Sequence, residues 1–167
     1  MEKAPQKAAF SAFLDRFPQV ELPVTLGEDT HHTFSRNNKP LPAQLIEQYI
    51  LPAEEEEADD LTEFVPCFRL ETLPAYSALV YWRAGLYSYQ YMLMTFDKKG
   101  DLIDRRVIAG SYYDEANLTQ SVATLTEDRK IFVVSGQSDP AGDHFDPATS
   151  TTHQFQLGED GRIEEEV

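Results

Sequence analysis

The spacing of the hydrophobic residues changes once along the chain, close to residue 64. Before that point, apolar residues recur at i, i+3, i+4 and i+7 within residues 6–17, which predicts one face of a helix that Pro18 ends. This stripe consists of Phe10, Phe13, Leu14 and Phe17. A second short helix is predicted over residues 42–51 for the same reason. The polar stretch between them is expected to be mostly loop, with a short extended piece near Val24.

After residue 64 the period falls to two, which is the repeat of a β-strand. Eight segments rich in β-branched and aromatic residues follow one another. Turn residues separate them, among them Gly85, Gly100, Asp128 and the pair Asp160–Gly161. Because short turns join consecutive strands in antiparallel order, the expected fold is α+β and mainly β. It is an antiparallel meander sheet or partly closed barrel of about seven to eight strands, with two short N-terminal helices.

The chain has 167 residues, which fits a single domain over residues 1–167. We expect residues 1–63 to form a helical and irregular part with an acidic loop, and residues 64–167 to form the meander. The one cysteine, Cys67, excludes a disulfide within the chain and a cysteine-based zinc cluster. Its strand-like surroundings predict a small buried hydrophobe rather than a reactive thiol.

Charge is the strongest signal of the composition. The chain has 29 acidic and 14 basic residues, which gives a formal net charge of -15. Because binding phosphates needs clustered lysine and arginine, nucleic acid and anionic membrane surfaces are poor partners. A basic protein is the expected partner. The densest acidic stretch lies within residues 53–63 and supplies the predicted partner-binding residues, which are Glu54, Glu55, Glu56, Glu57, Asp59 and Asp60.

The sequence has no apolar run long enough for a transmembrane helix, and its first residues lack the apolar core of a signal peptide. We therefore expect a cytoplasmic protein if Met1 is the native start, and a cell-envelope protein if a signal peptide has been removed. The order of three segments, residues 13–18, 91–110 and 157–165, resembles a group of small bacterial β-meander proteins, many of them predicted to be exported lipoproteins. That resemblance implies an envelope location and transfers no catalytic residue.

Catalytic motifs are absent from the sequence. It contains no nucleophile elbow, no phosphate-binding glycine loop and no zinc-protease helix motif. His31 and His32 lie in a polar stretch with Glu28 and Asp29, where exposed histidines are the ordinary outcome and a metal site is the weaker alternative. The acidic residues of the stretch 135–150 do not have calcium-loop spacing; they are Asp139, Asp143 and Asp146. No metal, cofactor or catalytic residue is expected.

Residues 86–97 carry aromatic and sulfur side chains on alternating positions. In a strand, Met92, Met94 and Phe96 point to one face, and the tyrosines point to the other with Leu93. We interpret the run as a central strand, and as an alternative ligand-binding face formed by Tyr81, Trp82, Tyr87, Tyr89 and Tyr91.

The sequence thus supports three functions. The first is a non-catalytic acidic protein-interaction module, such as an inhibitor or immunity-like protein that binds a basic partner protein. The alternatives are a small-ligand-binding β-barrel that uses the tyrosine face, or a cell-envelope lipoprotein domain. A metal-dependent enzyme has the least support, because neither the histidines nor the aspartates have the spacing of a metal site.

Overall fold

The computed structural model of the chain describes residues 3–54, 58–70, 74–86, 88–114, 116–139 and 145–166, with the backbone alone for 3–6 and 145. The helical elements are α1 (Lys3–Asp15), α2 (Thr30–Asn37), α3 (Ala43–Leu45), the π-helical turn η1 (Ile46–Ile50) and the 3₁₀ turn η2 (Leu51–Ala53). The strands are β1 (Val24–Leu26), β2 (Glu63–Arg69), β3 (Tyr76–Ala84), β4 (Ser88–Asp97), β5 (Leu102–Tyr113), β6 (Leu118–Leu125), β7 (Lys130–Ser138), β8 (Phe145–Leu157) and β9 (Ile163–Glu166).

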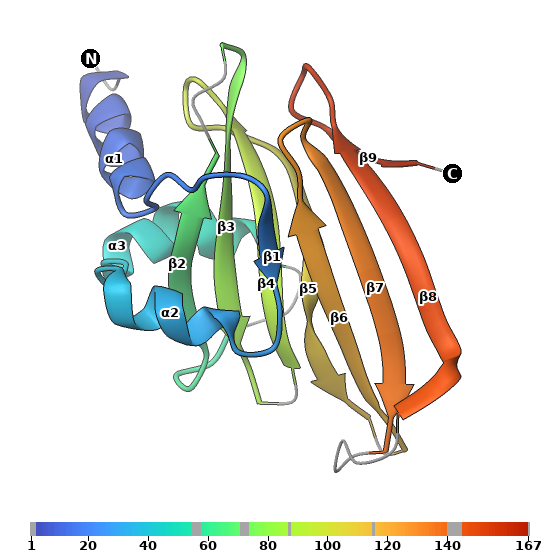
Figure 1. The fold of residues 1–167 in the computed structure, drawn as a ribbon. Coiled ribbons are helices and arrows are strands. Elements are labelled where there is room, and N and C mark those ends of the chain that lie inside the picture. The colour runs from blue at the N-terminus through green and yellow to red at the C-terminus, as the bar shows by residue number, and fades with distance from the viewer. Residues whose placement is uncertain are drawn as a thin grey trace.

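The described strands form one antiparallel sheet in the order β2-β3-β4-β5-β6-β7-β8-β9, and β1 pairs with β6 (Figure 1). The sheet is not closed into a barrel. The predicted mainly β meander is therefore confirmed, and each of its eight predicted strands is present. Gly100 and Gly161 have φ values of 93° and 90°, which explains why glycine stands at these two turns. In the β6–β7 turn the left-handed residue is Arg129, with φ 62°, rather than Asp128.

The prediction of two helices missed α2, whose segment was expected to be loop. The sequence of this helix, THHTFSRN, contains one large apolar residue, Phe34, and therefore has no apolar stripe. None of its residues is buried. Tertiary contacts hold it instead: the ring of Phe34 packs at 5.7 Å from that of Phe68. Just after the helix, the amide of Asn38 donates to the carbonyls of Pro66 and Cys67 at 2.7 and 2.9 Å. These bonds also cover the outer edge of β2.

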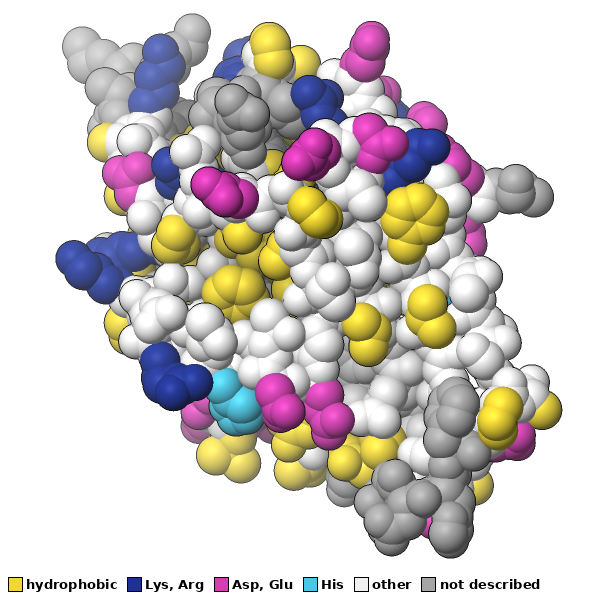
Figure 2. Space-filling model, viewed as in Figure 1, with side chains coloured by type: hydrophobic (Ala, Val, Ile, Leu, Met, Phe, Trp, Pro, Cys, Tyr) yellow, Lys and Arg dark blue, Asp and Glu magenta, His cyan; other side chains and the backbone are white. Residues whose placement is uncertain are grey.

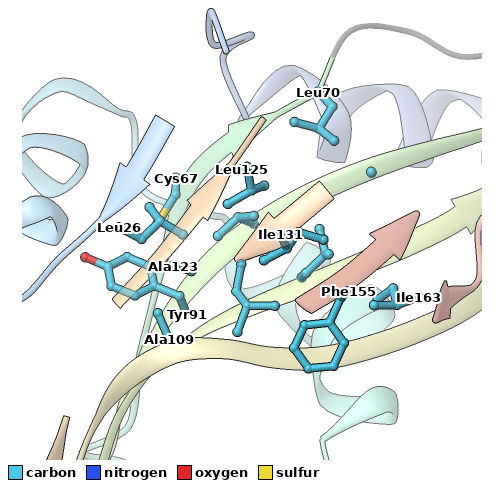
Figure 3. Close-up of a cluster of buried hydrophobic side chains, with 14 of the residues drawn as sticks. Leu26, Cys67, Leu70, Tyr91, Ala109, Ala123, Leu125, Ile131, Phe155 and Ile163 are labelled. Carbon is cyan, nitrogen blue, oxygen red and sulfur yellow. The ribbon is translucent and has the colours of Figure 1, made fainter. Parts of the chain in front are cut away.

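Two hydrophobic clusters divide the molecule into layers. One face of β3 and β4 packs against α1, α3 and η1 through a cluster that includes Phe13, Ile50, Met92 and Met94. The opposite face packs against the strands β6–β9 and β1. Figure 3 shows side chains of this second cluster converging from both sides, among them Tyr91, Ala109, Ala123, Ile131 and Phe155. The helices thus cover the methionine face of β4, and the tyrosine face turns toward the C-terminal strands.

The sheet folds over on itself because β5 and β6 pair over only part of their length. Their ladder runs from Gly110↔Ser121 to Tyr113↔Leu118 and ends there. Beyond it, the freed edge of β6 is taken by β1 (Figure 1). We call the two layers the β2–β5 half and the β6–β9 half, the latter with β1 on its edge.

The far ends of the two halves are joined by hydrogen bonds. The hydroxyl of Thr95 donates to the carbonyl of Gly161 at 2.6 Å, and the backbone N–H of Ile163 donates to Oδ2 of Asp104 at 2.8 Å. No helix formed by the described residues is both long and apolar enough to cross a membrane.

Figure 2 shows the outer surface from the same side. Over β6–β8, the described surface is mostly uncharged polar side chains with separate hydrophobic ones. The exposed hydrophobic residues there are Val122, Phe132 and Val134.

Candidate functional site

The main candidate site is a groove of about 350 Å³ between the two halves, which we call the β5 groove. It opens where β5 and β6 separate. One side comes from β4 and β5, and the floor and the opposite side come from β6–β9. Its lining consists of Gln90, Arg106–Tyr112, Thr119, Ser121, Val133, Ser135, His153, Phe155 and Glu165.

The main chain of β5 forms one wall of the groove. Seven consecutive residues, Arg106–Tyr112, line it. Since side chains alternate along a strand, a continuous run can only line a groove with its backbone included. The register with β4 shifts between Val107 and Ala109, so that Ile108 and Ala109 both pack into the cluster between the halves.

The floor of the groove is apolar, and the guanidinium group of Arg106 lies over it. Phe155 and Val133 are buried, at 6% exposure each. The guanidinium carbon of Arg106 lies 4.9 Å from the centre of the Phe155 ring, a cation–π contact. In the part of the chain that the structure describes, Arg106 forms no ion pair with a carboxylate.

Two polar pairs complete the lining. Nδ1 of His153 lies 3.0 Å from Oε1 of Glu165, and both side chains are about half exposed, at 48%. On the neighbouring strands, the hydroxyls of Ser121 and Ser135 lie 2.6 Å apart. Hydroxyl, imidazole, carboxylate and guanidinium groups therefore face one small volume.

The predicted tyrosine face is divided by the structure. Tyr81 points to the helix side of the sheet, is fully buried, and donates its hydroxyl to Oε1 of Glu54 at 2.7 Å. Trp82, Tyr89 and Tyr91 lie together on the opposite side, where they line a second cavity of about 130 Å³. Tyr87 lies outside the described residues. The structure thus gathers three of the five residues and separates Tyr81 from them.

The second cavity contains a stack of rings. The imidazole of His31 lies 4.1 Å from the ring of Trp82 at an interplanar angle of 5°, and Trp82 in turn stacks on Tyr89 at 5.7 Å. Burial and the neighbouring His32 lower the pKa of His31. His31 and Tyr89 therefore both pack against the indole of Trp82. The cavity meets the β5 groove at Gly110 and Ser121, which line both.

The backbone conformation and the close approach of β4 require glycine at position 110, where the two cavities meet. Its φ is 137°, and a Cβ added there would lie 2.0 Å from the carbonyl oxygen of Tyr89. Only glycine fits, because any side chain would push β5 away from β4.

The acidic residues predicted to bind a partner have different surroundings. Glu54 is buried, with its side chain 4% exposed, and its Oε2 lies 3.1 Å from Nε of Arg83 and 3.3 Å from Nη2 of Arg105. Its carboxylate is therefore not at the surface. Asp59 and Asp60 are exposed, whereas Glu55, Glu56 and Glu57 lie outside the described residues.

Of the candidate metal residues, Nε2 of His32 lies 3.9 Å from Oδ1 of Asp29. Among the described residues, no three histidine, cysteine or acidic side chains form a group that could hold a metal ion. Asp143 and His144 lie outside the described residues. Cys67 is buried, at 1% exposure, and burial raises the pKa of its thiol.

Searches against protein-family models, curated proteins and solved structures find no match to this chain. The function therefore has to be inferred from the site itself. The sequence patterns did not predict the β5 groove. The missed residues are Arg106, Ser121, Ser135 and Glu165. Because side chains alternate between the two faces of a strand, the sequence does indicate that these side chains point to the inner face of the sheet. No local signal in the sequence shows that β5 and β6 separate.

Proposed function

We propose that this protein is a non-catalytic binding protein that holds a small ligand in the β5 groove. The groove itself carries the proposal: it has an apolar floor, and polar groups from both halves of the sheet converge on it. Ligand sites are typically concave, largely apolar and equipped with a few polar groups that fix orientation. Its volume of about 350 Å³ lies within the range of roughly 300–1,000 Å³ that is usual for such sites.

Binding is favoured over catalysis because the polar groups of the groove are bonded in pairs. The two serine hydroxyls bond each other, and His153 bonds Glu165. A nucleophilic serine needs a general base within hydrogen-bond reach. Among the described residues, no hydrogen bond joins His153 to a serine of the groove.

Chemical-shift mapping with a mixed panel of amino acids, short peptides, sugars, nucleotides and small carboxylic acids tests the proposal. We expect at least one compound to shift the amide signals of Arg106–Tyr112 and of Ser121 and Ser135. A panel in which every compound leaves these signals unchanged at millimolar concentration contradicts the proposal.

A matched pair of variants locates the binding. In Ser135→Trp the indole fills the groove, so binding should fall at least tenfold. In Val134→Trp the new side chain projects from the outer face of the same strand, where Val134 is 50% exposed, and binding should be unchanged. Equal affinities of the two variants contradict the assignment to the groove.

A second candidate function is an acidic module that binds a basic protein. The net charge of -15 and the exposed Asp59 and Asp60 support it. The basic product of a neighbouring gene is the partner to test by pull-down. Its affinity should fall steeply between 50 and 300 mM salt, on the order of tenfold or more, since long-range attraction between opposite charges is screened. An affinity that does not change with salt contradicts this function.

A further inference from the structure

Arg106 is the arginine that lines the β5 groove. Arg83 and Arg105 both contact Glu54, and the exposed Arg162 contacts Asp160. Arg106 instead rests on the ring of Phe155 inside the groove and, among the described residues, pairs with no carboxylate. A guanidinium group presents a planar fork of donors that matches a carboxylate. The groove therefore offers a carboxylate-binding group to which no described carboxylate is paired.

The charge around Arg106 argues against a simple anion. Glu165 lines the same groove, and the whole chain carries a net charge of -15. A free anion would be repelled by both, whereas a molecule with a carboxylate and an ammonium group finds a partner for each. The charges of the groove thus favour a zwitterion.

Besides the carboxylate and the ammonium group, the backbone of β5 sets a third requirement for the ligand. Its ladder with β6 begins only at Gly110, so over residues 102–109 the edge away from β4 has no strand partner among those described. The part of this edge from Arg106 onward forms the wall of the groove. Unpaired N–H and C=O groups in a row are the template to which an extended peptide adds as a further strand.

We propose that the ligand of the β5 groove is a short peptide with free termini, which adds as a strand to β5 and places its carboxylate on Arg106. From Arg106 to Ala109 the wall is about 10 Å long, at roughly 3.3 Å per residue, which matches a peptide of three or four residues. Phe155 and Val133 then receive an apolar side chain of the peptide. This inference rests on the proposed function and adds the class of ligand to it.

The test compares three tripeptides by calorimetry: Ala-Val-Ala with free termini, its C-terminal amide, and a form N-methylated at the central residue. The free peptide should bind at least tenfold more tightly than the amide, which lacks the carboxylate. It should also bind at least tenfold more tightly than the methylated form, which lacks a main-chain donor. Equal binding by the three peptides overturns the inference.

Two variants test whether the carboxylate of the peptide binds Arg106. In Arg106→Gln the free peptide should lose at least tenfold in affinity and bind no better than the amide. Arg162→Gln is the control, because Arg162 is exposed and lies outside the groove. An unchanged amide spectrum away from the groove shows that Arg106→Gln is folded. If this folded variant still prefers the free acid tenfold, the role of Arg106 is overturned.

The outcome also separates this inference from the proposed function. If other compounds of the panel shift the groove signals and none of the peptides does, the groove is a ligand site and the peptide inference fails. If no compound shifts them, both fail.

Discussion

At the scale of single residues, burial sets the chemistry of the one thiol. Cys67 lies at 1% exposure between the two halves of the sheet, and burial raises the pKa of its thiol. The thiolate is the reactive form, and it is disfavoured in an apolar setting without a compensating cation. The prediction of a small buried hydrophobe at this position agrees with its place in the structure.

We therefore expect the thiol of Cys67 to react with a disulfide reagent such as DTNB at least 100-fold more slowly in the native protein than in urea at the same pH. The rate is measured by absorbance. Native and unfolded protein reacting at the same rate would contradict the buried position of Cys67.

Alternation along β4 was enough to predict which residues share a face. Met92, Met94 and Phe96 lie under the helices, and Tyr91 and Leu93 lie on the opposite side, as the period of two requires. The position of Glu54 could not be predicted in this way. It begins a run of acids that looks uniformly solvated, and its partners Tyr81, Arg83 and Arg105 lie on strands that come later in the chain.

At the scale of elements, Glu54 fixes the segment that joins η2 to β2. Its carboxylate reaches the sheet and contacts Arg83 of β3 and Arg105 of β5, while the hydroxyl of Tyr81 donates to it. Breaking a buried ion pair by removing one partner is costly, because the remaining charge stays desolvated. This carboxylate thus holds the end of the helical region against the sheet.

Glu54→Gln should lower the free energy of unfolding by about 3 kcal/mol, since it removes the buried carboxylate that contacts the guanidinium groups of Arg83 and Arg105. Urea unfolding measures the change. Asp60→Asn removes an exposed acid of the same segment and should change stability by less than about 0.5 kcal/mol. Similar losses in the two variants would show that Glu54 has no special role.

The strands were predictable and the groove was not, for one physical reason. Strand and turn signals are local, so glycines such as Gly100 and Gly161 mark the ends of the meander's strands in the sequence. The groove depends on where β5 stops pairing with β6, which is decided by the packing of the two halves. The same holds for α2, which has no stripe of its own and is held by β2.

At the scale of the whole molecule, the two halves are joined by a covalent turn on one side and by hydrogen bonds on the other. Thr95 of β4 is fully buried and donates to the carbonyl of Gly161 in the β8–β9 turn. Asp104 of β5 accepts from the first residue of β9. These bonds fix how far apart the halves stand, and hence the width of the β5 groove.

Thr95→Val keeps the shape of the side chain and leaves the carbonyl of Gly161 without its donor. We expect a loss of about 1–3 kcal/mol in unfolding free energy, with faster hydrogen exchange in β9. The control is Thr25→Val, because the Thr25–Thr124 hydroxyl pair is exposed and its loss should cost less than about 0.5 kcal/mol. An unchanged exchange rate in β9 would contradict this role of Thr95.

The pairing of β1 with β6 has a consequence for the order of folding during synthesis. Thr25 and Thr124 are partners although 99 positions separate them, so a ribosome makes β1 long before its neighbour exists. Closing so long a loop carries an entropic cost that local turns avoid, and it slows folding. The hairpins of the meander can form as they emerge, whereas the N-terminal strand has to wait. Within this sheet, β1 precedes the other strands along the chain and docks among the last.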